Sequence, residues 1–421
     1  MPKYQKNKRR RRHHFGKIKK PENIEMVSED GEKSEKSSRK NISLKILDGK
    51  RQTKKIRRLV FVGCILTIAL VMLIISVTSP TGIGELYTNL SASVSLKSNL
   101  PAEINGTETY NVSDKKGYFY LLSDTAISAF TNNGKTIFSD NHGFVSPVIS
   151  ESEARTLIYD QNGTGLRIYN AKGLVFSYNS KNVIFAADIA RNGSFAVASK
   201  AENYTSMVTV FDKKGKMLYE WYCPEEIINS VAVAPNGKSV AVSTVSVSGG
   251  KFDSTLYVLK YNSADPVFTK QYDGNLVYSI VSCTKKNFTV VCENKCDLIS
   301  WKDFSVTTHE TEYNVNYVRA NHKRTVISSC RENNDGNYTF HVYDSKNKLK
   351  TTFDFDGNVD DFRIDGNNIF ILSGNSVYLI NSDGKIAKTG NSVFGTVKII
   401  PVSSGSCLAV GHNSVTKIHL E

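Results

Sequence analysis

Two closely spaced cysteines are the first residues of this sequence that could do chemistry. The segment Cys292-Glu-Asn-Lys-Cys296 could form a disulfide across a short turn or supply half of a metal site. Zinc prefers four ligands, and no second Cys or His pair with zinc spacing accompanies these two. We therefore predict no metal site and leave open a disulfide between them. For Cys223, Cys330 and Cys407 we expect burial, because a thiol in a strand-like run usually serves as a small apolar group.

An acidic cluster, Asp354-Phe-Asp-Gly-Asn-Val-Asp-Asp361, invites comparison with a calcium loop. An EF-hand loop places its sharp-turn glycine at the sixth position, after oxygen ligands at the first, third and fifth. Gly357 comes two residues too early for that pattern. Because Asp, Asn and Gly are also the residues that turns require, we interpret the cluster as a turn between blades of the fold argued below.

Motifs of the common catalytic classes are missing from the sequence. It holds no Gly-x-Ser-x-Gly, no His-Glu-x-x-His and no phosphate-binding Gly-x4-Gly-Lys-Ser/Thr. Tryptophan occurs only at Trp221 and Trp301, too rarely for a quinone-binding propeller. We predict that the protein is not an enzyme and has no catalytic, cofactor-binding or metal-ligating residues.

The net charge of +14 belongs entirely to the N-terminal tail. Residues 1–58 hold 21 basic and 7 acidic residues, whereas the rest of the chain holds 33 of each. The tail is also poor in large apolar residues, so we expect it to be disordered. Because the remainder is electrically balanced, nothing in its summed charge favours nucleic-acid binding.

An uncharged apolar segment follows the tail. Leu59 to Thr78 contains twenty residues without a charge, which as a helix would span about 30 Å, the thickness of a bilayer's hydrocarbon core. A buried core helix and a cleaved signal peptide are the alternatives. The long charged tail and the lack of an Ala-x-Ala-like cleavage site argue against the signal peptide. The segment predicts a single transmembrane anchor at residues 59–78.

Basic residues immediately before this segment set its expected orientation. They are Arg51, Lys54, Lys55, Arg57 and Arg58. The positive-inside rule then places the N-terminus in the cytoplasm and the C-terminal domain outside, in the cell membrane by a single pass. We expect a linker at 79–98 and a folded domain at 99–421.

The folded domain is predicted to be all-β because it carries short alternating apolar runs separated by Asn, Asp, Gly and Lys clusters. One turn type recurs about every forty residues. Its clearest copies end at Gly134, Gly173, Gly215 and Gly384, and weaker ones lie near 265, 303 and 347. Four short strands in each such unit are typical of a β-propeller. Eight blades fit best, and seven remain an alternative because the fifth and sixth units are divergent.

The two ends of the domain predict how the ring closes. The last unit has only three strands, near 396–401, 406–411 and 414–420. A strand near Leu96 to Thr107 precedes the first complete unit. Exchange of this N-terminal strand into the last blade would complete it and protect its open edge.

The basic tail, the single anchor and turns such as Ala234-Pro-Asn-Gly-Lys238 resemble an uncharacterised, clostridial-type family of membrane-anchored propeller proteins. In its outer domain that family is similar to WD40-like and PQQ-like propellers. The resemblance extends from the tail to Glu421 and implies fold and topology, without an activity to transfer.

Propellers without catalytic motifs usually present a rigid binding platform. We therefore expect a non-enzymatic, membrane-tethered binding or scaffold module, with an envelope protein or a wall polymer as its partner. A divergent enzyme with a site in the central channel and a transmembrane ligand sensor are the alternatives. Polar or charged side chains converging from several inner-strand ends would favour the enzyme, whereas a channel lined by Val, Ala and Ser would count against it.

Overall fold

The structure is a computed structural model, and it describes residues 57, 59–71, 73, 87–88, 98–104, 106, 108–282, 285–330 and 336–421. The chain divides into two compact units, Met1–Val71 and Met72–Glu421. The first contains a helix over 59–71. No helix in the described ranges combines the length and apolar composition needed to cross a bilayer. The predicted tail apart from Arg57, the end of the predicted anchor and most of the predicted linker lie outside the described residues.

The second unit consists of antiparallel four-stranded sheets, each of which is one blade. Blade 1 contains β2(Thr109–Lys115), β3(Tyr118–Ser123), β4(Ala126–Thr131) and β5(Thr136–Asn141), and blade 2 contains β6(Pro147–Glu151), β7(Thr156–Asp160), β8(Gly165–Asn170) and β9(Gly173–Asn179). Blade 3 contains β10(Ile184–Ile189), β11(Phe195–Lys200), β12(Ser206–Phe211) and β13(Met217–Cys223), and blade 4 contains β14(Ile227–Val233), β15(Ser239–Ser248), β16(Lys251–Lys260) and β17(Phe268–Tyr272). Blade 5 contains β18(Ser279–Ser282), β19(Asn287–Val291), β20(Lys295–Ser300) and β21(Val306–Glu310), and blade 6 contains β22(Asn314–Ala320), β23(Arg324–Cys330), β24(Asn337–Asp344) and β25(Leu349–Asp356). Blade 7 contains β26(Asp361–Asp365), β27(Asn368–Ser373), β28(Ser376–Ile380) and β29(Ile386–Asn391), and blade 8 contains β30(Lys398–Ser403), β31(Ser406–Val410), β32(Ser414–His419) and β1(Ala102–Glu103).

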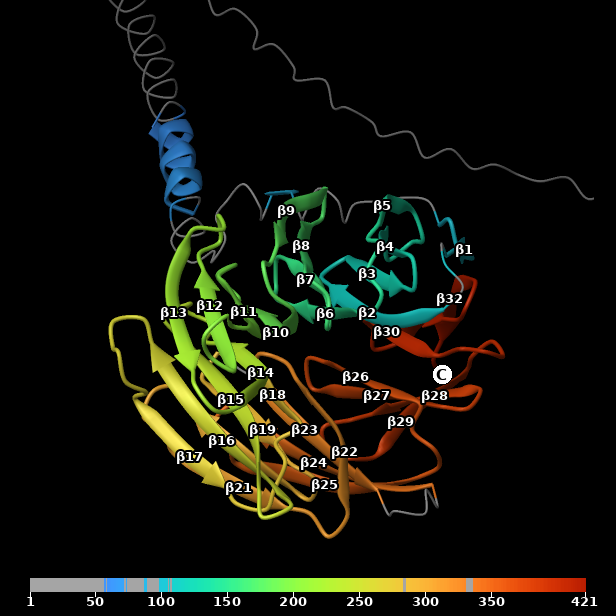
Figure 1. Cartoon of the computed structure of the whole chain (residues 1–421). Helices are drawn as coiled ribbons and strands as arrows, with labels where there is room; N and C mark the ends of the chain where they lie inside the picture. The colour runs from blue at the N-terminus through green and yellow to red at the C-terminus, as the bar shows by residue number, and fades with distance from the viewer. Residues whose placement is uncertain are drawn as a thin grey trace, which may run out of the picture. The chain divides into compact units, whose positions relative to one another are not determined.

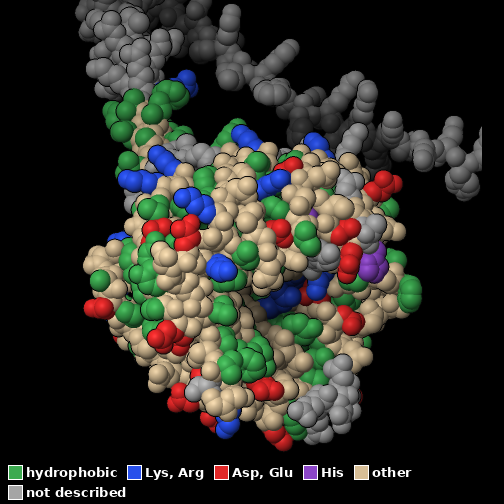
Figure 2. Space-filling view, in the orientation of Figure 1, with side chains coloured by type: hydrophobic (Ala, Val, Ile, Leu, Met, Phe, Trp, Pro, Cys, Tyr) green, Lys and Arg blue, Asp and Glu red, His purple; other side chains and the backbone are tan. Residues whose placement is uncertain are grey.

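Eight blades close into one ring (Figure 1). The first strand of each blade contacts the first strand of the next, from β2 round to β30 and back to β2, so these strands enclose the central channel. Figure 2 shows a hollow near the middle of the face on view. The eight-blade prediction is confirmed, and the seven-blade alternative is wrong because the divergent fifth and sixth units each form a complete sheet.

The two faces of the ring carry different connections. Face A holds the turns between the first and second and between the third and fourth strands of each blade. Face B holds the turns between the second and third strands and the segments that join one blade to the next. The recurrent turns predicted from the sequence are all turns between third and fourth strands, on face A.

Two of these turns show why the repeat requires glycine. Gly215 and Gly384 have φ angles of +83° and +79°, which favour a residue without a side chain. A Cβ at Gly215 would also overlap the ring of Phe176 in the preceding blade, and one at Gly384 would overlap Phe353 in the blade before it. The turn glycine therefore sets both the hairpin and the close packing of neighbouring blades.

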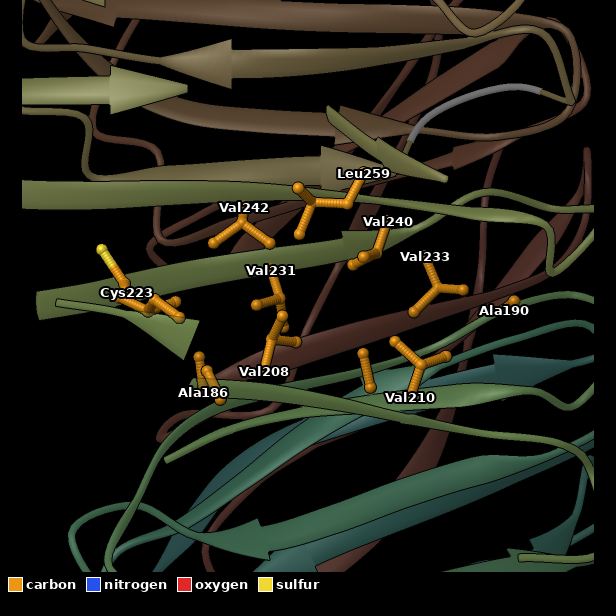
Figure 3. Packing of buried hydrophobic residues seen from close by; sticks show 13 residues of the cluster. Ala186, Ala190, Val208, Val210, Cys223, Val231, Val233, Val240, Val242 and Leu259 are labelled. Carbon is orange, nitrogen blue, oxygen red and sulfur yellow. The ribbon is translucent and has the colours of Figure 1, made fainter. Parts of the chain in front are cut away.

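The hydrophobic core is a series of layers between adjacent blades. Between blades 3 and 4, valines of β12, β14 and β15 meet face to face (Figure 3), as Val208, Val231 and Val242 illustrate. Burial of each such side chain stabilises the fold by about 1.5–3 kcal/mol. Similar layers lie between other neighbouring blades. Alternate residues of a central strand thus face opposite layers.

Strand exchange closes the ring, as the two chain ends predict. Ala102 and Glu103 of β1 pair with Val415 and Ser414 of β32, and β1 lies beside β32 in Figure 1. The next residue, Ile104, donates its N–H to the Asn413 carbonyl at 3.1 Å. The predicted outer strand near Leu96–Thr107 is thereby confirmed as the fourth strand of blade 8.

Candidate functional site

Charged side chains from five of the eight first strands gather in the central channel. Blades 1, 2, 6, 7 and 8 supply them, whereas the first strands of blades 4 and 5 carry none and that of blade 3 carries only Asp188. In Figure 2, Lys or Arg side chains lie beside Asp or Glu side chains within the hollow. The residues of this channel cluster are Asp114, Lys115, Glu151, Arg319, Asp361, Arg363 and Lys398.

Asp361 is the centre of one half of the cluster. Its side chain is fully buried, and its Oδ1 accepts a hydrogen bond from Arg319 Nη2 at 2.9 Å. Its Oδ2 accepts from Arg363 Nε at 3.3 Å and from the backbone N–H of Ile399 at 3.1 Å. One carboxylate thus joins the first strands of blades 6, 7 and 8.

Glu151 is the centre of the other half. Its carboxylate accepts from Ser113 Oγ at 2.5 Å and pairs with Lys115 Nζ at 3.4 Å. Lys115 is only 4% exposed, whereas the Glu151 side chain is 45% exposed, so water reaches Glu151. Arg363 of blade 7 links the two halves of the cluster, because its Nη2 donates to Oδ1 of Asn111 in blade 1 at 3.4 Å. This contact reaches across the channel side of blade 8.

The two carboxyl groups of blades 1 and 2 are driven toward different protonation states. Burial, followed by the nearby charge of Glu151, raises the pKa of Asp114 above its ordinary value. Burial would also raise the pKa of Glu151, but Lys115 and Arg363 together with the Ser113 hydroxyl outweigh it and lower that pKa. The two carboxyl groups therefore have pKa values shifted in opposite directions.

The first strands carry nearly equal numbers of the two charges, with four basic residues and five acidic ones once Asp188 and Asp365 are included. Burial would lower the pKa of Arg363, but Asp361 and the other carboxylates raise it. Burial lowers the pKa of Lys398, partly offset by Asp361. Arg319 is 27% exposed, and its Nε is buried with no hydrogen-bond partner among the described residues. The unmatched Arg319 donor suits the channel to an anionic group.

The cluster runs the length of the channel. Asp361 and Lys398 are the first residues of β26 and β30, at the face B end. Lys115 and Glu151 are the last residues of β2 and β6, at the face A end. A ligand can therefore meet charged groups from either face.

The predicted disulfide between Cys292 and Cys296 is not formed. Cys292 packs in the layer between blades 4 and 5, with Phe288 and Ile299. Cys296 packs in the layer between blades 5 and 6, with Leu298 and Ile327. The two side chains point to opposite faces of the same sheet, which keeps the thiols of the disulfide left open from the sequence apart.

The other sequence predictions at single residues have mixed outcomes. Cys223, Cys330 and Cys407 are buried, as expected. Of the predicted topology-determining residues, Arg57 is exposed on its helix. Arg51, Lys54, Lys55 and Arg58 lie outside the described residues, as does Cys283.

Within the acidic segment Asp354–Asp361, the first three residues end β25, Asp361 begins β26, and residues 357–360 form the turn that joins blade 6 to blade 7, as interpreted from the sequence. In the described part of the chain, no group of three His, Cys, Asp or Glu residues could hold a metal ion.

The last residue of the acidic segment, Asp361, belongs to the channel cluster. Sequence reasoning missed this residue, and also Arg319 and Arg363. The available signal was a charged residue inside a first-strand run, as in Asn316-Tyr-Val-Arg-Ala320 and Asp361-Phe-Arg-Ile-Asp365.

A separate groove of about 370 Å³ lies on face A between blades 6 and 7. Its basic residues are Lys323, Arg324 and Lys350. Arg324 Nη1 donates to the Asn367 carbonyl at 2.8 Å, and Lys350 pairs with Asp344 at 3.2 Å. Two of the three basic groups, Arg324 and Lys350, are therefore already partnered, so we assign the site to the channel.

Comparisons with known proteins agree with this fold. Residues 91–420 match the model of a "Family of unknown function (DUF5711)". No curated protein matches the chain. Among solved structures, the chain is similar to one titled "Crystal structure of the eukaryotic initiation factor", with 13% identity, a TM-score of 0.50 and coverage of 79% of this chain and 91% of that one.

Two further structures give similar values. BamB from Moraxella catarrhalis has 11% identity and a TM-score of 0.49, with coverage of 77% of this chain and 100% of that one. Apo AztD from Citrobacter koseri has 12% identity and a TM-score of 0.48, with coverage of 68% and 86%. At these identities the likeness concerns the fold alone.

Proposed function

The chain belongs to the DUF5711 family of unknown function, and we propose that this member is a membrane-tethered binding module that receives an anionic group of its partner in the central channel. The observation that carries the proposal is the convergence of the channel cluster from five blades. The ring would close equally well if these first strands carried Val, Ala and Ser at the same places, as the first strands of blades 4 and 5 do. Charged groups buried in a channel are costly, so their presence favours recognition.

The sign of the recognised charge follows from Arg319, whose buried Nε has no hydrogen-bond partner among the described residues and can donate to an anion. Lys115, Arg363 and Lys398 are further cationic donors on the first strands of the ring. A carboxylate or phosphate on a wall polymer or an envelope protein would find Arg and Lys donors there. Such a group is the ligand we propose.

The proposed tether rests on the sequence. The uncharged segment Leu59–Thr78 follows a dense basic run, which is the pattern of a single-pass anchor with a cytoplasmic N-terminus. The propeller would then lie outside the cytoplasmic membrane.

Calorimetry on the full chain in detergent tests channel binding, with inorganic phosphate and succinate as probes. We expect Lys398→Gln to weaken binding by about tenfold, because a charge-assisted contact contributes roughly 1.5–3 kcal/mol. Lys417→Gln, on the exposed side of the same blade, is the matched control and should bind as the wild type does. Equal affinities of both variants, or no binding of either probe to the wild type, would reject the channel as an anion site.

A second candidate is an enzyme that uses the channel carboxyls. The convergence of charged side chains from several first strands favours it, and so do the opposite pKa shifts of Asp114 and Glu151, since two carboxyl groups with different pKa values suit general acid–base catalysis. Purified chain incubated with wall polymer distinguishes the two candidates. Release of soluble fragments that Glu151→Gln abolishes would support the enzyme, whereas binding without release supports the module.

A further inference from the structure

The balanced charge of the propeller hides a separation of charge between its two faces. The described turns of face A contain sixteen basic and five acidic residues. The basic residues are Lys116, Lys135, Arg155, Lys172, Arg191, Lys213, Lys214, Lys216, Lys238, Lys285, Lys286, Lys302, Lys323, Lys346, Lys348 and Lys385. Thirteen of these sixteen are exposed, so face A presents a basic surface, and all but Lys385 of the sixteen lie in blades 1 to 6.

Face B has the opposite composition. The described turns and blade connections of this face contain nine acidic residues and one basic residue, Lys181. The acidic residues are Glu108, Asp124, Glu202, Glu225, Glu226, Asp273, Glu293, Glu312 and Asp360. The basic charge of face A and the acidic charge of face B cancel when all charges of the domain are summed. Composition alone therefore indicates no electrostatic field.

The chain enters the propeller at face A. Asn99 donates its N–H to the Asn133 carbonyl at 2.7 Å, in a face A turn of blade 1. Leu100 packs on Gly134 of the same turn, where a Cβ would come within 2.7 Å of the leucine side chain. From there β1 runs toward face B. The segment that precedes the domain therefore leaves from the basic face.

We propose that face A lies on the anionic phospholipid headgroups of the membrane that holds the chain's own N-terminal segment. For its orientation the inference rests on the proposed tether; for its chemistry it rests on the charge of face A alone. Lysines within a Debye length of an anionic surface are attracted to it, and many act together on a flat face. Face B and its end of the channel, where Lys398 lies, would then remain open to a partner.

Lysine acylation followed by mass spectrometry tests the proposal on the full chain in vesicles. One set of vesicles is phosphatidylcholine alone, and the other is equal parts phosphatidylcholine and phosphatidylglycerol. We expect acylation of the face A residues Lys116, Lys172 and Lys348 to slow by roughly threefold in the anionic vesicles, because the lipid attracts and covers them. Lys181 on face B should react equally in both, as the internal reference.

A charge-reversal pair provides the matched variants. The turn containing Lys214 and Lys216 is held by their backbone N–H groups, which donate to Asp212 Oδ1 at 2.8 and 2.9 Å. The Lys214→Glu/Lys216→Glu chain should therefore fold and lose protection at Lys172. The face B variant Lys181→Glu/Lys200→Glu should keep that protection.

Several outcomes would overturn the proposal: equal acylation of both faces in both vesicles, protection of face A in phosphatidylcholine alone, or protection by soluble polyphosphate but not by anionic vesicles. Tethering is read separately, from whether an alkaline wash strips the chain from the vesicles. If it does, anionic vesicles added to the released chain still test face A, so failure of the tether and failure of the surface are distinct results.

Discussion

At the scale of single residues, Asp361 shows how the channel carries buried charge. A buried carboxylate is stable only when its partners replace the water that it loses. Arg319, Arg363 and the backbone N–H of Ile399 do so here. The same carboxylate holds two guanidinium groups in the channel, so removing its charge should leave both arginines without an ion-pair partner on Asp361.

Asp361→Asn should lower the free energy of unfolding by about 3–5 kcal/mol, because it leaves two arginines without their countercharge. Urea denaturation of the full chain in detergent measures the change. Asp365→Asn, an exposed residue of the same strand, is the control and should change it by less than about 0.5 kcal/mol. Similar effects of the two substitutions would show that Asp361 does not hold the arginines.

The opposite pKa shifts of Asp114 and Glu151 predict opposite effects of pH. A raised pKa in the folded state stabilises the protein below the ordinary value of 3.8, and this contribution is lost as the pH rises through the folded pKa of Asp114. A lowered pKa stabilises it above the ordinary 4.5, and this contribution is lost as the pH falls through the folded pKa of Glu151.

Urea denaturation from acidic to neutral pH separates the two contributions. Asp114→Asn should be more stable than the wild type at neutral pH, because it removes the cost of ionising a buried carboxyl. Glu151→Gln should be less stable at neutral pH and approach the wild type in acid. Parallel pH profiles of the two variants would contradict opposite pKa shifts at Asp114 and Glu151.

At the scale of elements, first strands are joined by side chains of their neighbours. Asp188 accepts from the backbone N–H of Val233 at 2.7 Å, and Ser230 accepts from that of Ile280 at 2.9 Å. Asp361 accepts from Ile399 in the same way. A first strand has a strand partner on one edge only, so a side chain from the preceding blade satisfies an N–H on its open edge.

Ring closure depends on a short contact, which makes it sensitive to truncation. Deletion of residues 79–95 should leave the domain folded, because β1 and Asn99 remain. Deletion of 79–108 removes β1 and exposes the edge of β32, and it should lower the melting temperature by at least about 5 °C or cause aggregation. Differential scanning calorimetry of both chains measures the difference. Equal melting temperatures would mean that the exchanged strand does not close the ring.

At the scale of the whole molecule, the proposed tether predicts a protease pattern. Protease added to wall-stripped cells should degrade the chain after Pro80 and spare the basic tail, because the charge asymmetry around Leu59–Thr78 places the tail inside. Immunoblots against a tag at each terminus report which part survives. Protection of the C-terminal domain in intact cells, with degradation only after lysis, would reverse the orientation.

The sequence by itself determined the repeat, the blade count and the closure. Its turn residues recur because a positive φ and a close neighbouring blade both exclude other residues, as at Gly215 and Gly384. The glycine recurs at Gly134, Gly173, Gly215 and Gly384, and the weaker copies near 265, 303 and 347 keep the spacing, so the period could be counted. The burial of Cys223, Cys330 and Cys407 could likewise be predicted from their strand-like surroundings.

Only the tertiary structure decided where charges meet. Glu151 and Arg363 are distant in the sequence and share one channel, because the ring brings the first strands of different blades together. Cys292 and Cys296 are close in the sequence and lie in different layers, because alternate strand residues face opposite sides of a sheet. The opposing charges of the two faces cancel in any sum over composition. They become visible only once each turn is placed on its face of the ring.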